Sequence, residues 1–181
     1  MTSCPLCPQG VGRGSEDAEA SRTTLHPQGV GRGSKDAEAS RTTLCQTDAG
    51  TVLWRSTLYR IVLADEPDYP GFLRVVLNAH VKEMTDLSPA DQAALMQGVF
   101  AAEAALREVM QPDKINLASL GNVVPHLHWH VIPRFRDDPH FPNPVWGQKT
   151  TQGKSHAAPD RTQLAATLSR LLAPAPETES P

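Results

Sequence analysis

One stretch of the sequence decides the fold, and it reads Val123-Val124-Pro125-His126-Leu127-His128-Trp129-His130-Val131-Ile132-Pro133-Arg134. From His126 to Val131, histidines alternate with apolar residues. Because successive side chains of a strand point to opposite faces, this alternation predicts a strand over residues 123–134. His126, His128 and His130 would then share one face at intervals of about 6.5–7 Å, with the apolar residues between them facing the core.

Three alternating histidines indicate a functional site, since the whole chain has only seven. Any one of them, taken alone, is better explained as a structural residue held by hydrogen bonds. Two functions remain open for the group. Imidazoles at this spacing on a strand suit zinc, and a neutral imidazole is also a competent nucleophile toward phosphorus. A flanking histidine would then bind phosphate oxygens or carry a proton near neutral pH.

The surrounding sequence predicts an α+β fold, with a mainly antiparallel sheet, one long helix between its halves and a short C-terminal helix. Besides the histidine strand, runs of β-branched and aromatic residues predict strands over 51–55, 58–64, 72–77 and 115–120. Ser88-Pro89 is a capping pair that predicts the start of the long helix, which ends before Pro112. Its apolar face repeats at helical spacing through Leu95, Val99, Ala102, Leu106 and Val109. Residues 160–172 predict the short helix.

The N-terminal region contains a duplication. Residues 8–25 and 27–44 are identical except that Glu16 is replaced by Lys35 in the second copy. Two copies rich in glycine, serine and charge lack the apolar residues of a stacked repeat, so we expect a flexible insertion. The predicted division is a flexible segment over 1–50, a catalytic domain over 51–147, and a C-terminal extension over 148–181 with the short helix and a disordered tail.

Composition excludes several classes. The net charge of −3 over 181 residues gives no basic surface for nucleic acid. No apolar run approaches the roughly 20 residues of a membrane-spanning helix, and the N-terminus lacks the pattern of a secretory signal. We therefore expect a soluble cytoplasmic protein without nucleic-acid or membrane partners. Cys4, Cys7 and Cys45 are an odd set that does not predict a disulfide framework.

The run from His126 to Ile132 resembles the signature of the histidine triad (HIT) superfamily, in which three histidines alternate with apolar residues. The resemblance covers residues 51–135, because the order of Asn78-Ala79-His80, the long helix, Asn116, Gly121-Asn122 and the histidines follows the family. The stretch 137–146, with DDPHFP followed by PVW, resembles a bacterial branch described as diadenosine polyphosphate hydrolases.

This resemblance implies a nucleotide hydrolase or nucleotidyl transferase that acts at the α-phosphate of an adenylyl-type substrate. His128 would be the nucleophile that forms a nucleotidyl-histidine intermediate. His130 would contact the phosphate and the leaving group, bearing a positive charge, and His126 would orient His128. Substrate-binding roles are implied for Asn116, Asn122 and His80. Val123 departs from the family, since relatives often carry Ser or Thr there.

The resemblance also implies a homodimer and no cofactor for catalysis. Some bacterial relatives bind a structural zinc with an N-terminal C-x-x-C and two later histidines, which here would be Cys4, Cys7, His80 and His126. Two other functions stay open: a zinc-dependent hydrolase with the histidines as ligands, and a non-catalytic nucleotide-binding module.

A few further side chains bear on the site. His140 and His156 are expected to be solvated loop residues. Arg134 is expected either to meet phosphate or to form a surface salt bridge. Trp146 is the tryptophan for which stacking, rather than packing, is most readily expected.

Overall fold

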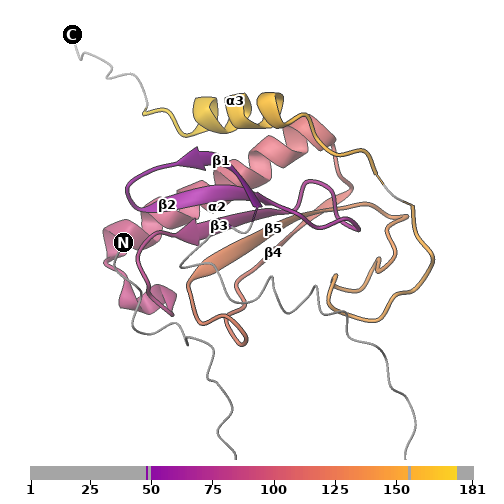
Figure 1. Cartoon of the computed structure of the whole chain (residues 1–181), viewed down its shortest axis with the longest axis horizontal. Helices are drawn as coiled ribbons and strands as arrows, with labels where there is room; N and C mark the ends of the chain where they lie inside the picture. Colours follow the sequence, from indigo (N-terminus) through magenta and orange to yellow (C-terminus); the bar gives the residue numbers. More distant parts are fainter. Residues whose placement is uncertain (1–47, 49, 155, 175–181) are drawn as a thin grey trace, which may run out of the picture.

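The computed structural model describes residues 48, 50–154 and 156–174 (Figure 1). It contains five strands, two α-helices and one short 3-10 helix, in the chain order β1 Gly50–Arg55, β2 Tyr59–Ala64, β3 Leu73–Leu77, η1 Met84–Asp86, α2 Pro89–Met110, β4 Lys114–Ala118, β5 His128–Arg134 and α3 Arg161–Leu171. All strand pairs are antiparallel, and the order across the sheet is β1-β2-β3-β5-β4. The predicted α+β fold is confirmed.

The long helix begins and ends where its sequence predicts. The Ser88 hydroxyl accepts a hydrogen bond of 3.2 Å from the backbone N–H of Asp91, and Pro89 occupies the first turn. At the other end, Gln111 adopts a left-handed conformation with φ of 50° just before Pro112. These caps satisfy groups that a helix end would otherwise leave without partners.

Helices α2 and α3 lie on the same side of the sheet (Figure 1), where they build the main hydrophobic core. One face of α2 supplies Leu95, Val99, Ala102 and Leu106, all fully buried. The sheet supplies the alternating residues of its inner strands, which include Ile61, Leu63, Leu73, Val75, Leu77 and Val131. Because these residues alternate with those on the other face, the opposite side of the sheet is left for the site.

Helix α2 carries a glycine, Gly98, where it packs against Tyr59 of β2. A Cβ atom on Gly98 would lie 2.5 and 2.6 Å from two ring carbons of Tyr59 and 2.7 Å from its hydroxyl oxygen. The Tyr59 ring therefore occupies the space that any other residue at position 98 would need. This contact fixes the distance between α2 and β2.

Helix α3 belongs to the same core. Its first turn is capped by Asp160, which accepts from the backbone of Thr162 and Gln163. Leu164 and Leu168 are fully buried in the main cluster. The predicted boundaries of the three chain segments stay a prediction, but residues 161–171 pack as part of the domain core.

The structure corrects the start of the histidine strand. The sequence predicts a strand over 123–134, whereas β5 begins at His128. Pro125 has no N–H to donate to a neighbouring strand, and the His126 N–H turns back to the Val124 carbonyl at 2.8 Å. His128 and His130 share a strand face as predicted, but His126 lies in the turn that precedes the strand.

The duplicated segment, the three cysteines and the last residues of the tail lie outside the described residues. Among the helices that the structure describes, none has an apolar stretch long enough to span a bilayer.

Candidate functional site

The candidate site lies on the sheet face that is turned away from α2 and α3. Two register pairs bring its side chains together across β3 and β5: Arg74 is opposite His130, and Val76 is opposite His128. On the other side of β5, Ala118 of β4 is also opposite His130. Facing residues of neighbouring strands have Cβ atoms about 4.5–5.5 Å apart, so the histidine pair lies between Arg74 and the β4 edge.

His128 is held as a neutral imidazole with a defined tautomer. Its Nδ1 lies 2.6 Å from the carbonyl oxygen of His126. A carbonyl only accepts, so Nδ1 carries the proton and the lone pair resides on Nε2. Burial lowers the pKa of His128, opposed by this backbone hydrogen bond and assisted by the positive charge of Arg74. The ring is therefore deprotonated at Nε2 at neutral pH, which leaves a lone pair available there.

His130 packs against His128 and against two aromatic rings. Its centroid lies 4.6 Å from that of His128, 5.3 Å from Phe72 and 5.2 Å from Trp146. Burial, together with the charges of His128 and Arg74, lowers the pKa of His130 to about 3. The expectation of a cationic His130 is therefore wrong for the ligand-free protein, since the ring is neutral near pH 7.

His126 faces His80 rather than the other two histidines. Its Nε2 donates to the Leu77 carbonyl at 2.7 Å, which leaves the lone pair on Nδ1. That Nδ1 lies 3.3 Å from Nδ1 of His80. Two nitrogens of a tetrahedral zinc site with Zn–N bonds of about 2.0–2.1 Å are roughly 3.3–3.4 Å apart, so the pair has the spacing of two zinc ligands.

The other two predicted zinc ligands, Cys4 and Cys7, lie outside the described residues. Within the described part of the chain, no group of three His, Cys, Asp or Glu side chains is arranged to hold a metal ion. The geometry of His80 and His126 thus fits half of the predicted ligand set.

Arg134 is buried, contrary to both expectations from the sequence, and it organises one side of the site. Its guanidinium forms a double ion pair with Asp138 at 2.6 and 3.0 Å, and its Nη1 donates to the Asn116 side-chain oxygen at 2.6 Å. A fourth hydrogen bond of 2.8 Å reaches the Asn143 carbonyl. Since a guanidinium only donates, the Asn116 oxygen must face Arg134, and the Asn116 NH₂ group is turned away from it.

His140 is also buried, so the expectation of a solvated loop residue is wrong. Its Nδ1 is hydrogen-bonded to the Tyr69 hydroxyl, and its backbone N–H donates to Asp138 at 2.9 Å. His156 is half-buried, stacks on Phe135 at 3.7 Å and pairs with Asp137 at 2.8 Å. Trp146 lies between His140 and His156 in the chain. It is 53% exposed, and its ring packs against the His130 ring.

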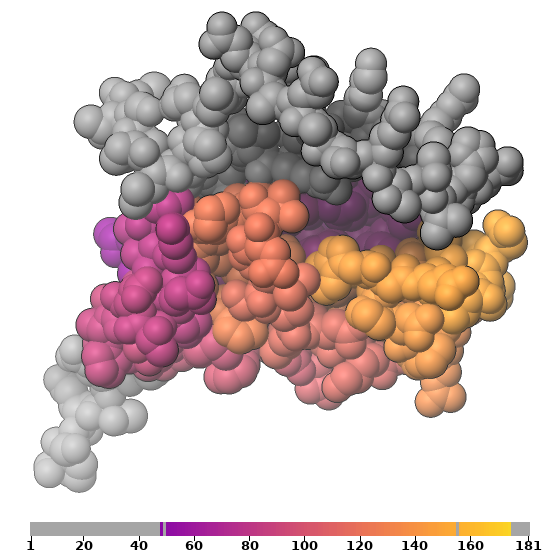
Figure 2. All heavy atoms as spheres, turned by 90° about the horizontal axis from the view of Figure 1, so that it is seen from below, coloured from indigo at the N-terminus to yellow at the C-terminus, as the bar shows by residue number. Residues whose placement is uncertain are grey.

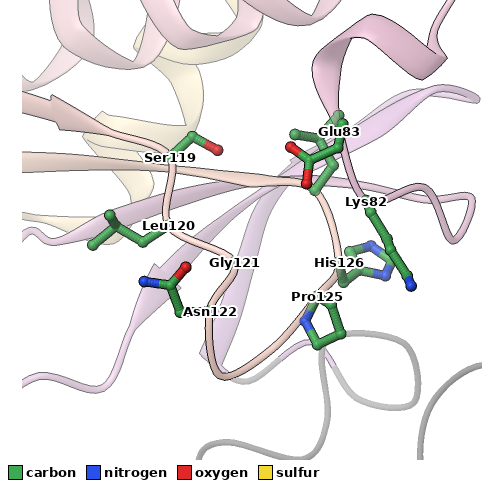
Figure 3. Close-up of a pocket in the computed structure, with 9 residues that line it drawn as sticks. Lys82, Glu83, Ser119, Leu120, Gly121, Asn122, Pro125 and His126 are labelled. Atoms are coloured by element: carbon green, nitrogen blue, oxygen red, sulfur yellow. The ribbon is translucent and has the colours of Figure 1, made fainter.

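A polar pocket of about 250 Å³ adjoins His126, and exposed Asn122 is part of its wall. It lies between two segments that meet in space: the magenta residues 80–90 lie beside the orange residues 120–130 (Figure 2). The backbone bond from Leu127 N–H to the Val81 carbonyl, 2.7 Å long, joins them. In Figure 3 the Glu83 carboxylate and the Ser119 hydroxyl project toward the space between these segments.

Neither His128 nor His130 lines this pocket, whereas Asn122 does. Asn116 lies on β4 opposite Ile132, two residues after His130. Three residues near the site are absent from the sequence prediction: Glu83, Ser119 and Arg74. Ser119 donates to the His128 carbonyl at 3.0 Å, which supports the backbone of the first strand residue. Only Arg74 has a signal in the sequence, since a charge within the apolar run of β3 requires a partner.

The model of the HIT domain family matches residues 47–137, just over half of the 181-residue chain. The chain belongs to the HIT domain family. The match contains the whole sheet, α2, and all three histidines of the signature. The predicted resemblance is thereby confirmed.

Two curated relatives of the chain have names that state an enzymatic activity. The chain is 32% identical over 108 residues to an AP-4-A phosphorylase of Mycobacterium tuberculosis (strain CDC 1551 / Oshkosh), covering 56% of this chain and 55% of that protein. It is 27% identical over 92 residues to a bis(5'-nucleosyl)-tetraphosphatase (asymmetrical) of Schizosaccharomyces pombe, covering 48% and 50%. The chain spans about half the length of these curated relatives.

A solved HIT structure covers more of the chain. The histidine triad protein of Bradyrhizobium japonicum is 32% identical, covers 70% of this chain and 92% of its own length, and superposes with a TM-score of 0.55. The likeness thus extends to the arrangement of sheet and helices.

Proposed function

We propose that this HIT domain is a nucleotide hydrolase or nucleotidyl transferase that acts at the α-phosphate of an adenylyl-type substrate, with His128 as the nucleophile. The observation that carries the proposal is the 2.6 Å contact between His128 Nδ1 and the His126 carbonyl. It assigns the proton to Nδ1 and the reactive lone pair to Nε2. The backbone thus fixes the tautomer, as a second group does in other activated nucleophiles.

The names of the two curated relatives support a dinucleoside polyphosphate as the substrate class. In the first step, the Nε2 lone pair of His128 attacks the α-phosphorus, and the bond to the bridging oxygen breaks. The electron pair leaves with the polyphosphate, which is a stable anion and needs no proton at that moment. This fits a neutral His130, which offers a ring N–H as a hydrogen-bond donor to a phosphate oxygen.

In the second step, the oxygen of a water or a phosphate attacks the same phosphorus and the P–N bond breaks. The electron pair returns to His128 Nε2, and the attacking group releases its proton to solvent if it is water. We infer that Asn116 donates its NH₂ group, which is turned away from Arg134, to a phosphate oxygen or to the leaving group. Splitting one displacement into two lowers the barrier of each.

The test is a turnover panel with a diadenosine tetraphosphate, an adenosine phosphoramidate and adenylyl sulfate, using substrate labelled at the α-phosphate. We expect rapid quenching to trap the label on wild-type protein and not on His128→Ala, with activity preserved in EDTA. Zinc-dependent activity with no label trapped on wild-type protein would favour the zinc-dependent hydrolase, whereas a structural zinc leaves the trapped label in zinc-loaded protein. Nucleotide binding without turnover would favour the binding module.

We also infer that His80 and His126 are two ligands of a structural zinc, completed by Cys4 and Cys7. The 3.3 Å spacing of their Nδ1 atoms supports this ligand pair. Bound there, zinc would crosslink the N-terminal segment to the turn before β5. That turn contains the carbonyl that orients His128, so the ion would serve the nucleophile through the backbone without touching substrate.

Metal content tests this second proposal independently of activity. We expect about one zinc per chain in the wild type, and loss of zinc with a lower melting temperature in Cys4→Ser, Cys7→Ser and His80→Gln. Cys45→Ser is the matched control and should keep its zinc. Equal zinc content in all four variants would contradict the ligand set. The homodimer stays a prediction.

A further inference from the structure

On the proposed function the site face needs a permanent positive charge, and three arginines lie on its inner strands. The edge strands add Arg55, opposite Arg60 and paired with Asp48, and Lys114, opposite Arg134; both are exposed at the rim of this face. A polyphosphate substrate carries several negative charges, and charge on the transferred phosphorus must be stabilised in the transition state. Arg60, Arg74 and Arg134 belong to β2, β3 and β5, and their register places them on the face of His128 and His130. His130 is neutral, so it does not supply this charge.

Two of these arginines are committed to structural partners. Arg134 is 2% exposed and uses four of its five N–H groups on Asp138, Asn116 and the Asn143 carbonyl. Arg60 pairs with Asp48 at 2.7 Å and also donates to Asn78 and the Leu77 carbonyl, at the end of β3.

Arg74 is placed differently, because it lies directly across the strand pair from His130. Its guanidinium donates to Glu66 at 2.8 Å and lies 5.4 Å from the centroid of the Phe72 ring. That ring in turn packs edge-on against His130 at 5.3 Å. Arg74, Phe72 and His130 therefore form one connected group, in which Glu66 and the ring hold the cation in place.

The charge of Arg74 acts on both histidines of β5. It contributes to lowering the pKa of His128 and of His130, whereas neither Arg60 nor Arg134 is a cause of either shift. Electrostatic influence of this kind falls with distance. The register agrees, since Arg74 faces His130 directly and His128 lies two residues further along the same face of β5.

Given the proposed function, we propose that Arg74 binds the polyphosphate chain of the leaving group, next to His130, and so makes this site selective for polyphosphate over uncharged leaving groups. An arginine keeps its charge at every physiological pH, and its planar fork matches two phosphate oxygens at once. Glu66 acts as a positioning residue, since it orients the guanidinium without reaching the reacting atoms.

The test compares two substrates that share the adenylyl group and differ in the leaving group, namely diadenosine tetraphosphate and adenosine phosphoramidate. In Arg74→Gln we expect kcat/KM for the tetraphosphate to fall about 10- to 100-fold, the range of a lost charged hydrogen bond. For the phosphoramidate we expect a change of less than about threefold. The inhibition constant of inorganic tripolyphosphate should rise by about the same factor as kcat/KM for the tetraphosphate falls.

Arg170→Gln is the matched control, because this arginine is exposed on α3 and pairs with Glu108 on the helix side of the molecule. It should leave both substrates unaffected. If Arg74→Gln does not fold, Arg74→Lys carries the same test, since it keeps the charge and loses the fork. We then expect a smaller loss that is still selective for the tetraphosphate.

Three results would overturn the assignment or separate it from the proposed function. Equal losses for both substrates would mean that Arg74 acts on the α-phosphate or on folding, not on the leaving chain. If Arg74→Gln changed only the KM for inorganic phosphate as the attacking group, the cation would bind that phosphate and not the leaving group. A wild type that turns over neither substrate would sink the proposed function itself, whatever the variant does.

Discussion

The Arg134 guanidinium donates a hydrogen bond of 2.6 Å to the side-chain oxygen of Asn116, from the opposite member of the β4–β5 pair. The same guanidinium is clamped by the Asp138 carboxylate. The orientation of the Asn116 amide is therefore set by two charged residues that lie 18 and 22 positions later in the chain. The Asn116 NH₂ group therefore has a fixed orientation, because the side-chain amide cannot rotate without breaking this hydrogen bond.

Asn116→Asp separates this structural role from substrate binding. The new carboxylate still accepts from Arg134, so we expect the free energy of unfolding to change by less than about 1 kcal/mol. The variant loses the NH₂ donor and places a negative charge near the phosphate. We expect kcat/KM for diadenosine tetraphosphate to fall about 10- to 100-fold, measured at saturating and limiting substrate. Unchanged kinetics would show that Asn116 does not meet the substrate.

Arg134→Met should be among the most destabilising single changes in the domain. It leaves the Asp138 carboxylate, 3% exposed, without its counter-charge, which costs about 3–5 kcal/mol for a buried pair. Urea unfolding followed by circular dichroism measures the loss. Arg136→Met is the control, since Arg136 is largely exposed and its contact with Asp113 is 3.5 Å. We expect less than about 0.5 kcal/mol there.

The pair Arg134→Met/Asp138→Leu tests the cause of that loss. If the unpaired carboxylate is responsible, removing it as well should restore part of the stability. A double variant as unstable as the single one would instead assign the loss to the hydrogen bonds of Asn116 and Asn143.

His130 makes the stability of the fold depend on pH. In the unfolded chain its imidazole takes up a proton near pH 6.5, but in the folded protein only near pH 3. Between these values the unfolded state binds more protons, so the free energy of unfolding falls as the pH falls. From pH 7 to pH 5 this residue should account for roughly 2 kcal/mol.

The measurement is urea unfolding at pH 7, 6 and 5 for the wild type and for His130→Gln. The variant should lose less stability over this range than the wild type. In the NMR spectrum of the folded wild type, the His130 ring resonances should not titrate above pH 5. A midpoint between pH 6 and 7 would contradict the burial of a neutral ring.

Gly98→Ala should destabilise the protein, although alanine is favoured over glycine inside a helix by about 1 kcal/mol. The added methyl group would come within 2.5–2.7 Å of the end of the Tyr59 side chain, and such overpacking costs about 1–3 kcal/mol. Thermal unfolding measures the change. Ala104→Gly, at an exposed position of α2, should destabilise in the usual direction of helix propensity. An increase in melting temperature for Gly98→Ala would contradict the close contact.

Local patterns in the sequence were sufficient for most of the fold. Ser88-Pro89 and the spacing of Leu95 and Leu106 predict α2, because caps and helical periodicity depend on neighbours in the chain. The alternation after His128 likewise predicts β5 and its two faces. The predicted start of that strand, at residue 123, is too early. Residues 123–127 have the composition of a strand, but Pro125 and the turn at His126 delay its start to His128.

The site could be predicted only in part, because its details depend on contacts between distant residues. The burial of His140 rests on Tyr69, 71 positions earlier, and on a loop that folds back against the sheet. The importance of Arg74 depends on the β3–β5 register, which places it opposite His130. The local sequence has no signal for the burial of His140, and for Arg74 it indicates only that a charge in an apolar strand needs a partner, not that His130 lies opposite.

The place of β5 in the sheet has a consequence for how the site moves. β5 pairs with β3 from His128 to Val131 and with β4 from His130 to Arg134, so His130 and Val131 have a partner strand on both edges. Amide protons in such a strand exchange with deuterium only through large-scale opening of the molecule. The ring that we propose as the nucleophile thus sits next to doubly paired strand residues, and we expect accommodation during turnover in the nucleotide and in the exposed loop that bears Trp146.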